Sequence, residues 1–149
     1  TSFSNGGSLP NNGNKRVYLS CSPAEPSHVY AASTDNVYKS TTEGILFTAL
    51  SNPNSSGLAF AVSDVNTNNM IYGYVDLFAS TDGGINFTQK TEWANQNDAY
   101  IHADLRIAEC VNGTFYVGTD GYFAKSNDNG NTWTRLNDNG YLERNYRYF

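Results

Sequence analysis

Three copies of one eight-residue pattern constrain the fold of this chain more than any other feature of its sequence. Each copy follows Ser-x-Asp-x-Gly-x-x-aromatic, and we interpret Glu43 as the substitute for the Asp in the first copy. The pattern favours a tight hairpin, because an Asp side chain can accept hydrogen bonds from nearby backbone N–H groups and Gly tolerates the positive φ of a turn. The residues to which we assign a structural role in these hairpins are Ser40, Gly44, Phe47, Ser80, Asp82, Gly84, Phe87, Ser126, Asp128, Gly130 and Trp133.

The spacing of the copies predicts the architecture. Their opening serines are 40 and 46 residues apart, and this is the period of a four-stranded propeller blade. Only 15% of the residues are charged, and 11 Tyr and 8 Phe are present, a composition that favours strands. We therefore expect an all-β fold, a β-propeller segment of about three four-stranded blades that belongs to a larger propeller. The expected divisions are a linker or loop over 1–14, blades over 15–50, 57–90 and 101–137, and the start of a further blade or a closing strand over 142–149.

Three blades in an open arc would leave sheet faces uncovered, and uncovered apolar faces promote aggregation. The expected partners are therefore the remaining blades of the propeller or a complementing chain. Cys21 and Cys110 are far apart in the sequence, and we interpret them as two half-buried strand cysteines, with a single disulfide as the alternative.

Charge and hydropathy exclude other classes of partner. The net charge is −5, so nucleic acid is not expected, because phosphate binding needs a basic surface. No apolar run approaches the ~20 residues that cross a bilayer, and no secretory signal is visible at the start of the sequence. This absence is expected of a processed mature chain or an internal fragment.

The octamers resemble the Asp-box (BNR) repeat of sialidases, sortilin-type receptors, xyloglucanase-like hydrolases and photosystem assembly propellers. The stretch 75–148, with Ile101-His102-Ala103-Asp104 and a Gly118-Thr119-Asp120-Gly121 turn, is similar to secreted Bacteroidota propellers of the type IX secretion kind. The resemblance implies a secreted or cell-surface location. The sialidase Arg triad and the Asp-Val-Gly-Gly segment of xyloglucanase-like enzymes are missing from this sequence. The resemblance therefore implies the propeller scaffold and not the catalytic residues of these enzymes.

A candidate ligand site follows from the loops at the end of each blade opposite the octamers. The turns between the second and third strands carry a recurring acid at Asp35, Asp76 and Asp120. A long connection over 91–100 precedes the third blade and contains Trp93, and His102 and Asp104 follow it. Because loops on rigid blades commonly hold functional residues, we expect these side chains to converge. The ligand-binding residues that we predict are Trp93, His102, Asp104 and Asp120.

Each of these residues also has a structural interpretation. Asp in a turn is ordinary turn chemistry, and His102 and Asp104 could brace the central channel as satisfied polar residues. The spacing contains no metal-ligand signature, so neither a metal nor a cofactor is expected. No nucleophile–base pair is present, and no catalytic residue is assigned.

The function expected from the sequence is that of a non-catalytic extracellular or cell-surface scaffold that binds a glycan or a protein, including surface or secretion proteins. The alternative is the propeller portion of a glycoside hydrolase of the xyloglucanase- or sialidase-like type. Hydrolysis usually requires two carboxylates ~5–10 Å apart. The sequence offers Asp76, Asp104 and Asp120 for that role.

Overall fold

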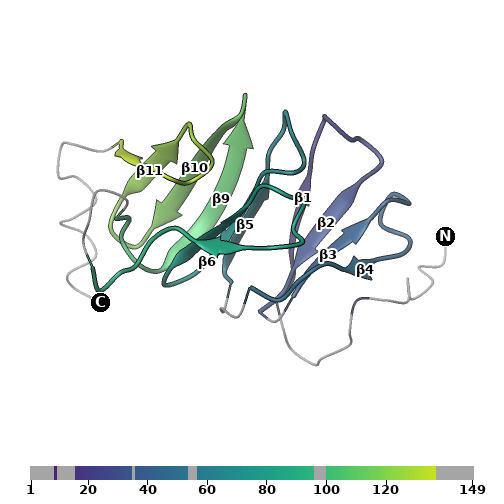
Figure 1. Cartoon of the computed structure of the whole chain (residues 1–149), viewed down its shortest axis with the longest axis horizontal. Coiled ribbons are helices and arrows are strands. Elements are labelled where there is room, and N and C mark those ends of the chain that lie inside the picture. The colour runs from purple at the N-terminus through teal and green to yellow at the C-terminus, as the bar shows by residue number, and fades with distance from the viewer. Residues whose placement is uncertain (1–8, 10–15, 35, 54–56, 96–99, 137–149) are drawn as a thin grey trace.

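The computed structural model describes residues 9, 16–34, 36–53, 57–95 and 100–136, and these residues confirm the all-β prediction. They form three four-stranded antiparallel sheets that lie side by side, with the strands of each sheet in sequence order (Figure 1). The first sheet contains β1 (Tyr18–Cys21), β2 (Val29–Ala32), β3 (Val37–Ser40) and β4 (Thr48–Ala49). The second contains β5 (Ala59–Val62), β6 (Met70–Gly73), β7 (Leu77–Ser80) and β8 (Thr88–Gln89). The third contains β9 (Leu105–Val111), β10 (Thr114–Thr119), β11 (Phe123–Ser126) and β12 (Thr134–Arg135).

The apolar core lies between the sheets. Side chains alternate between the two faces of a strand, and each face of the second sheet contributes to a separate cluster. One cluster joins the first and second sheets and consists of Tyr30, Ala32, Val37, Phe60, Val62, Met70 and Tyr72. The other joins the second and third sheets and consists of Ala59, Ala61, Ile71, Leu77, Ala79, Ile101, Leu105, Ala108, Phe115, Val117 and Ala124.

Hydrogen bonds reinforce the contact between the first two sheets. The Ser22 hydroxyl donates to the carbonyl of Ser63 at 2.7 Å. The backbone N–H of Val62 donates to Ser20 Oγ at 3.0 Å, and the buried Tyr72 hydroxyl donates to the carbonyl of Ser33 at 3.0 Å. Adjacent sheets are thus held by polar contacts at their inner strands as well as by apolar packing.

Each octamer forms the connection from the third strand of a sheet to the fourth. In the second octamer, Ser80 Oγ accepts the N–H of Gly84 at 2.9 Å, and Asp82 Oδ1 accepts the N–H of Asn86 at 2.9 Å. The glycine has φ +85°, a value that a residue with a Cβ adopts only with strain. The third octamer repeats this arrangement through Ser126, Asp128, Gly130 and Thr132, with distances of 2.8 Å for both hydrogen bonds.

The aromatic residue that ends an octamer packs toward the preceding sheet. Phe87 lies against the cluster between the first and second sheets, with its ring centroid 6.1 Å from that of Tyr72. Trp133 lies against the cluster between the second and third sheets, and its indole N–H donates to the carbonyl of Gly130 at 3.1 Å. The octamer therefore contributes to the contact between sheets as well as to its own hairpin.

The first octamer corrects one sequence interpretation. Thr42, not Glu43, takes the place of the Asp, because Thr42 Oγ1 accepts the N–H of Leu46 at 3.0 Å. Glu43 occupies the following position with φ +56°, where the second octamer has a glycine. The assignment of Glu43 as the Asp substitute is therefore wrong: a hydroxyl oxygen can accept the same hydrogen bond that a carboxylate accepts.

The two cysteines are both free, so the alternative of a disulfide between them is wrong. Cys21 is exposed, so the expectation that it is half-buried is wrong. Cys110 is half-buried as expected, with its thiol 3.4 Å from a carboxylate oxygen of Asp64. Burial raises the pKa of the Cys110 thiol.

Among the described residues there is no helix with the length and hydropathy needed to cross a bilayer. The segments predicted as a linker over 1–14, apart from Leu9, and as a closing strand over 142–149 lie outside the described residues. The limits predicted for the three blades remain predictions.

Candidate ligand-binding rim

The candidate site lies where the second sheet meets the third, at the end of the sheets opposite the octamers. The turn from β6 to β7 contributes Tyr74 and Asp76, and the turn from β10 to β11 contributes Asp120. The start of β9 contributes Asp104 and Arg106. We call these five residues the polar rim.

A two-pronged ion pair forms the centre of the rim. Arg106 Nε donates to Asp120 Oδ1 at 2.7 Å, and Arg106 Nη2 donates to Asp120 Oδ2 at 2.8 Å. Such a fork holds both side chains in a defined orientation. The hydrogen bond from Arg106 lowers the pKa of the Asp120 carboxyl, and the same bond raises the pKa of the guanidinium. Asp120 is therefore a fixed carboxylate and a poor proton donor.

Tyr74 connects this ion pair to Asp104. The Arg106 guanidinium lies over the Tyr74 ring, with Cζ 5.7 Å from the ring centroid, a cation–π geometry. The hydrogen bond between the Tyr74 hydroxyl and Asp104 raises the pKa of that phenol. On the backbone, the N–H of Leu105 donates to the carbonyl of Tyr74 at 2.9 Å, so the two sheets are joined at this point.

Asp104 adopts a left-handed backbone conformation, with φ +63°. This conformation is uncommon for residues other than Gly, although Asp and Asn tolerate it better than most. Strained residues are enriched at functional sites. The strained backbone just before β9 places Asp104 beside Tyr74.

His102 is half-buried and is held by its neighbours. Its backbone N–H donates to the Tyr122 hydroxyl at 3.0 Å, and its Nδ1 lies 2.9 Å from the carbonyl of Ala103. The His102 and Tyr122 rings pack edge to face with centroids 6.2 Å apart. Gly121 lies directly beneath the imidazole, where a Cβ would come within 2.6 Å of the ring. These contacts favour a bracing role for His102 over ligand binding.

Trp93 is exposed but anchored. Its side chain is 56% exposed, and its backbone N–H donates to Asp76 Oδ1 at 2.8 Å. This hydrogen bond ties the connection before β9 to the turn that carries Tyr74. Asp76 is thus used as a turn acceptor, while Asp35 lies outside the described residues.

The structure therefore brings Asp104 and Asp120 into one network and places His102 next to it, since the His102 ring lies against Gly121, the residue that follows Asp120. The two residues that link the network, Tyr74 and Arg106, were missed by the sequence interpretation. One signal was available for Arg106: it is a basic residue two positions after Asp104, at the start of the strand that Asp104 precedes.

A hollow of about 160 Å³ opens beside the ion pair. Its lining comes entirely from the third sheet and consists of Arg106, Ile107, Gly118, Thr119, Asp120, Gly121, Tyr122 and Phe123. In the described part of the chain, no group of three His, Cys, Asp or Glu residues is placed to hold a metal ion. The chemistry available at the rim is hydrogen bonding, aromatic contact and a fixed ion pair.

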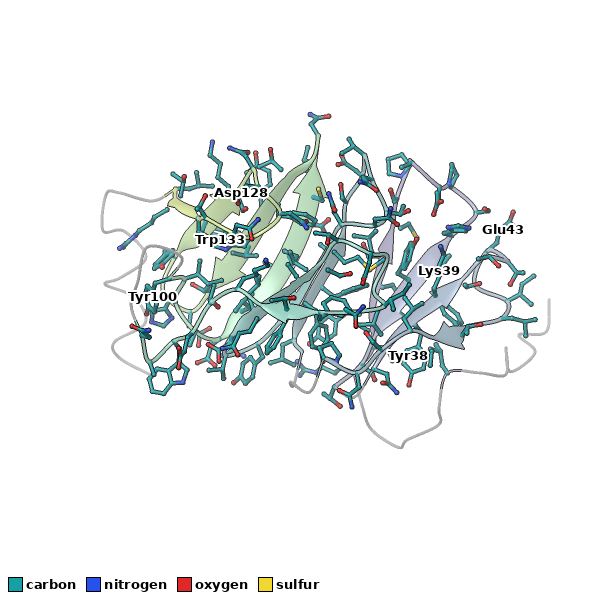
Figure 2. The ribbon with its side chains drawn as sticks, viewed as in Figure 1. Tyr38, Lys39, Glu43, Tyr100, Asp128 and Trp133 are labelled. Carbon is teal, nitrogen blue, oxygen red and sulfur yellow. The ribbon has the colours of Figure 1, made fainter. Side chains whose placement is uncertain are left out.

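Figure 2 shows the side chains of the sheets and their loops, with Tyr100 near the rim end of the third sheet and Trp133 and Asp128 toward the octamer end.

No protein-family model matches the chain, and no curated protein matches it. Solved structures do. The GH74 enzyme of Niastella koreensis matches with a TM-score of 0.62 and 23% identity, over 78% of this chain and 17% of that one. The GH74 xyloglucanase of Xanthomonas campestris matches with a TM-score of 0.60 and 16% identity, over 80% and 23%. YCF48 bound to D1 peptide matches with a TM-score of 0.56 and 14% identity, over 85% and 45%.

At these levels of identity, the similarity to the solved structures shows the fold of this chain. The chain is a segment of a β-propeller, built from three of the four-stranded sheets that such proteins repeat. It spans less than half the length of each of these structures. The prediction of a propeller segment is thus confirmed.

Proposed function

We propose that this chain is part of an Asp-box (BNR) propeller of a secreted or cell-surface protein, and that its polar rim binds an uncharged glycan without cleaving it. The observation that carries the proposal is the fixed arrangement of Tyr74, Arg106, Asp104 and Asp120 next to the exposed Trp93. Carboxylates and a guanidinium held in place can hydrogen-bond sugar hydroxyls with little loss of side-chain entropy. The exposed Trp93 ring supplies the apolar contact that a sugar face requires.

The charge of the rim supports an uncharged ligand. Asp120 neutralises Arg106, so Asp76 and Asp104 leave the rim with a net negative charge. A sugar acid would bring its carboxylate next to these groups, and like charges in proximity are unfavourable. We therefore expect neutral oligosaccharides to bind more tightly than oligosaccharides of uronic or sialic acid.

Titration calorimetry with a panel of neutral and acidic oligosaccharides tests the proposal. Trp93→Ala and Arg106→Gln should each weaken binding of the neutral ligand by about tenfold or more, equivalent to about 1.4 kcal/mol. Lys90→Gln is the matched control, because Lys90 bonds to Asn131 in an octamer at the opposite end of the sheets. Unchanged binding in both rim variants, or tighter binding of the acidic sugars, would contradict the proposal.

The second candidate is the propeller portion of a glycoside hydrolase, and the likeness to GH74 enzymes favours it. Against it stands the ion pair, since a carboxylate with a lowered pKa is a poor general acid and Asp120 is held in that state by Arg106. The test is polysaccharide hydrolysis by the wild type, Asp104→Asn and Asp120→Asn. Turnover that disappears in both variants would replace the binding proposal with the enzymatic one.

A further inference from the structure

The turn from β9 to β10 contains an Asn-Gly pair, the sequence in which an asparagine amide is most readily lost. The turn consists of these two residues, since Val111 pairs with Thr114 across it. Asn112 and Gly113 have φ +51° and +76°, and Asn-Gly is favoured in such a turn because both of its residues need a positive φ. The folding of the turn therefore places a chemically reactive pair at the octamer end of the third sheet.

An Asn-Gly pair can lose ammonia without an enzyme or a cofactor. The Gly113 nitrogen, as its proton is removed, attacks Cγ of Asn112 and forms a new C–N bond that closes a cyclic imide. The Cγ–Nδ2 bond breaks, and the amide leaves as ammonia with that proton. Water then opens the imide at either carbonyl and leaves aspartate or isoaspartate in place of Asn112. Because Gly113 has no Cβ, its nitrogen is open to this reaction.

The second sheet restrains the nucleophile of this reaction. Asp64 Oδ1 accepts the N–H of Gly113 at 2.8 Å, and Asp64 Oδ2 accepts the N–H of Asn112 at 2.6 Å. A carboxylate that is bound to an N–H opposes the removal of its proton, because the resulting anion would face a negative charge. Val65 also lies close to the turn, since a Cβ on Gly113 would come within 3.1 Å of its side chain. The contact between the second and third sheets thus keeps the Gly113 nitrogen protonated and fixed in position.

A second Asn-Gly pair, in the third octamer, provides an internal comparison. The N–H of Gly130 donates to Ser126 Oγ at 2.8 Å within the same hairpin, and Gly130 is buried. The amide of Asn129 is also bound, since its Nδ2 donates to the carbonyl of Ser80 at 3.1 Å. Asn112, in contrast, is exposed. The nucleophile in the octamer is therefore restrained by its own hairpin, whereas the nucleophile in the β9–β10 turn is restrained by another sheet.

We propose that Asn112 is a site of spontaneous deamidation that is controlled by the contact between the second and third sheets. The reaction is suppressed while Asp64 holds the turn, and it proceeds when this contact opens. The product then opposes closure, because it places a new carboxylate beside that of Asp64, and isoaspartate also lengthens the backbone of the turn. The modification therefore makes an opening of this interface irreversible. The proposal is independent of what the polar rim binds.

Peptide mapping by mass spectrometry, with chromatographic separation of the isoaspartate product, measures deamidation at both Asn-Gly pairs in one sample. The full chain is incubated at mildly alkaline pH as wild type, Asp64→Ala and Tyr72→Phe, and the wild type is also incubated unfolded in urea. Tyr72→Phe is the matched control, since it removes a hydrogen bond between the first and second sheets and leaves the Asp64 contact in place. Asn129 reports on global unfolding in every sample.

In the wild type, Asn112 should deamidate at least about tenfold more slowly in the folded chain than in urea. Asp64→Ala should raise the rate at Asn112 by about tenfold, the factor that corresponds to a hydrogen bond to a charged group, without raising the rate at Asn129. Tyr72→Phe should leave both rates unchanged. Equal rates at Asn112 in the wild type and Asp64→Ala would overturn the proposal. So would an equal rise at Asn129 in Asp64→Ala, or an equal rise at Asn112 in Tyr72→Phe, since global unfolding would then account for the reaction.

The effect of the product on the interface is tested with Asn112→Asp. This variant should melt at a lower temperature than the wild type. Most of that loss should disappear when Asp64→Ala is also present, because the repulsion requires both carboxylates. A loss of equal size with and without Asp64→Ala would refute the claim that the product opposes closure of the interface.

Discussion

The contact between Asp64 and the turn of the third sheet offers a quantitative test of how the sheets are joined. Asp64 follows β5 in the second sheet, and its carboxylate accepts the N–H groups of Asn112 at 2.6 Å and Gly113 at 2.8 Å, in the turn from β9 to β10. Both turn residues have positive φ, +51° and +76°. This geometry points their N–H groups toward the second sheet, so Asp64→Ala should weaken the contact between the two sheets.

The expected magnitude follows from the number and exposure of these hydrogen bonds. A hydrogen bond to a charged group contributes about 1.5–3 kcal/mol when it is protected from water. Asp64 is only half-buried, and solvent screening reduces such contributions. We therefore expect Asp64→Ala to lower the free energy of unfolding by about 1–2 kcal/mol, and Tm by roughly 2–8 °C. Glu92→Ala, which removes an exposed carboxylate, is the control and should have little effect.

The pH dependence supplies an independent check. The N–H of Gly113 is the main group that lowers the pKa of the Asp64 carboxyl in the folded protein. A lowered folded-state pKa means that the stabilisation is fully present above the unfolded pKa of about 3.9 and is lost as the pH falls through the folded value. Urea unfolding at pH 7 and at successively lower pH should therefore show the difference between wild type and Asp64→Ala shrinking below about pH 4. A difference that stays constant with pH, or that is no larger than that of Glu92→Ala at pH 7, would refute the reasoning.

Three further predictions concern the hairpins and the first interface, each measured by thermal or urea unfolding. Thr42→Asp should stabilise the protein by about 0.5–1 kcal/mol, because a carboxylate would replace the hydroxyl that accepts the N–H of Leu46; a neutral or destabilising result would contradict this assignment. Gly84→Ala should lower the free energy of unfolding by about 2–4 kcal/mol, since its φ is +85° and a Cβ would lie 2.9 Å from a neighbouring side chain. Gly44→Ala should lower it by only about 1–2 kcal/mol, the backbone strain alone, since the nearest contact of its Cβ would be 3.8 Å. Equal losses of stability in the two variants would show that the close contact at Gly84 costs nothing. Tyr72→Phe should cost about 1–2 kcal/mol by removing the buried hydrogen bond that the Tyr72 hydroxyl donates to the carbonyl of Ser33, and a variant as stable as the wild type would show that this hydrogen bond adds nothing to the interface.

The hairpins were predictable because their interactions are local. The serine, the acceptor at the third position and the glycine lie within five residues, and the hydrogen bonds that join them are between residues four apart, such as Ser80 with Gly84. The error at Glu43 arose from reading the acid as the essential feature. The structure shows that the requirement is an oxygen acceptor at the third position, and Thr42 meets it.

The rim was predictable only in part, because its interactions join segments that are distant in the sequence. Asp104 and Asp120 were recognised from their positions at strand ends. Arg106 and Tyr74 were not, since the guanidinium stacks on a ring from another sheet. His102 was expected as a ligand residue, yet it packs against Tyr122 and is held by it.

The sequence by itself therefore determined the all-β class, the repeat and the position of each tight hairpin, since turn chemistry and the period of the repeat act over short distances along the chain. The tertiary structure decided which faces of the sheets are covered and which polar side chains meet. Tyr30 and Tyr116 occupy the same position in their sheets. Tyr30 is buried because the second sheet packs on it, whereas Tyr116 is exposed. Burial depends on what lies across the interface, and no local pattern in the sequence encodes that.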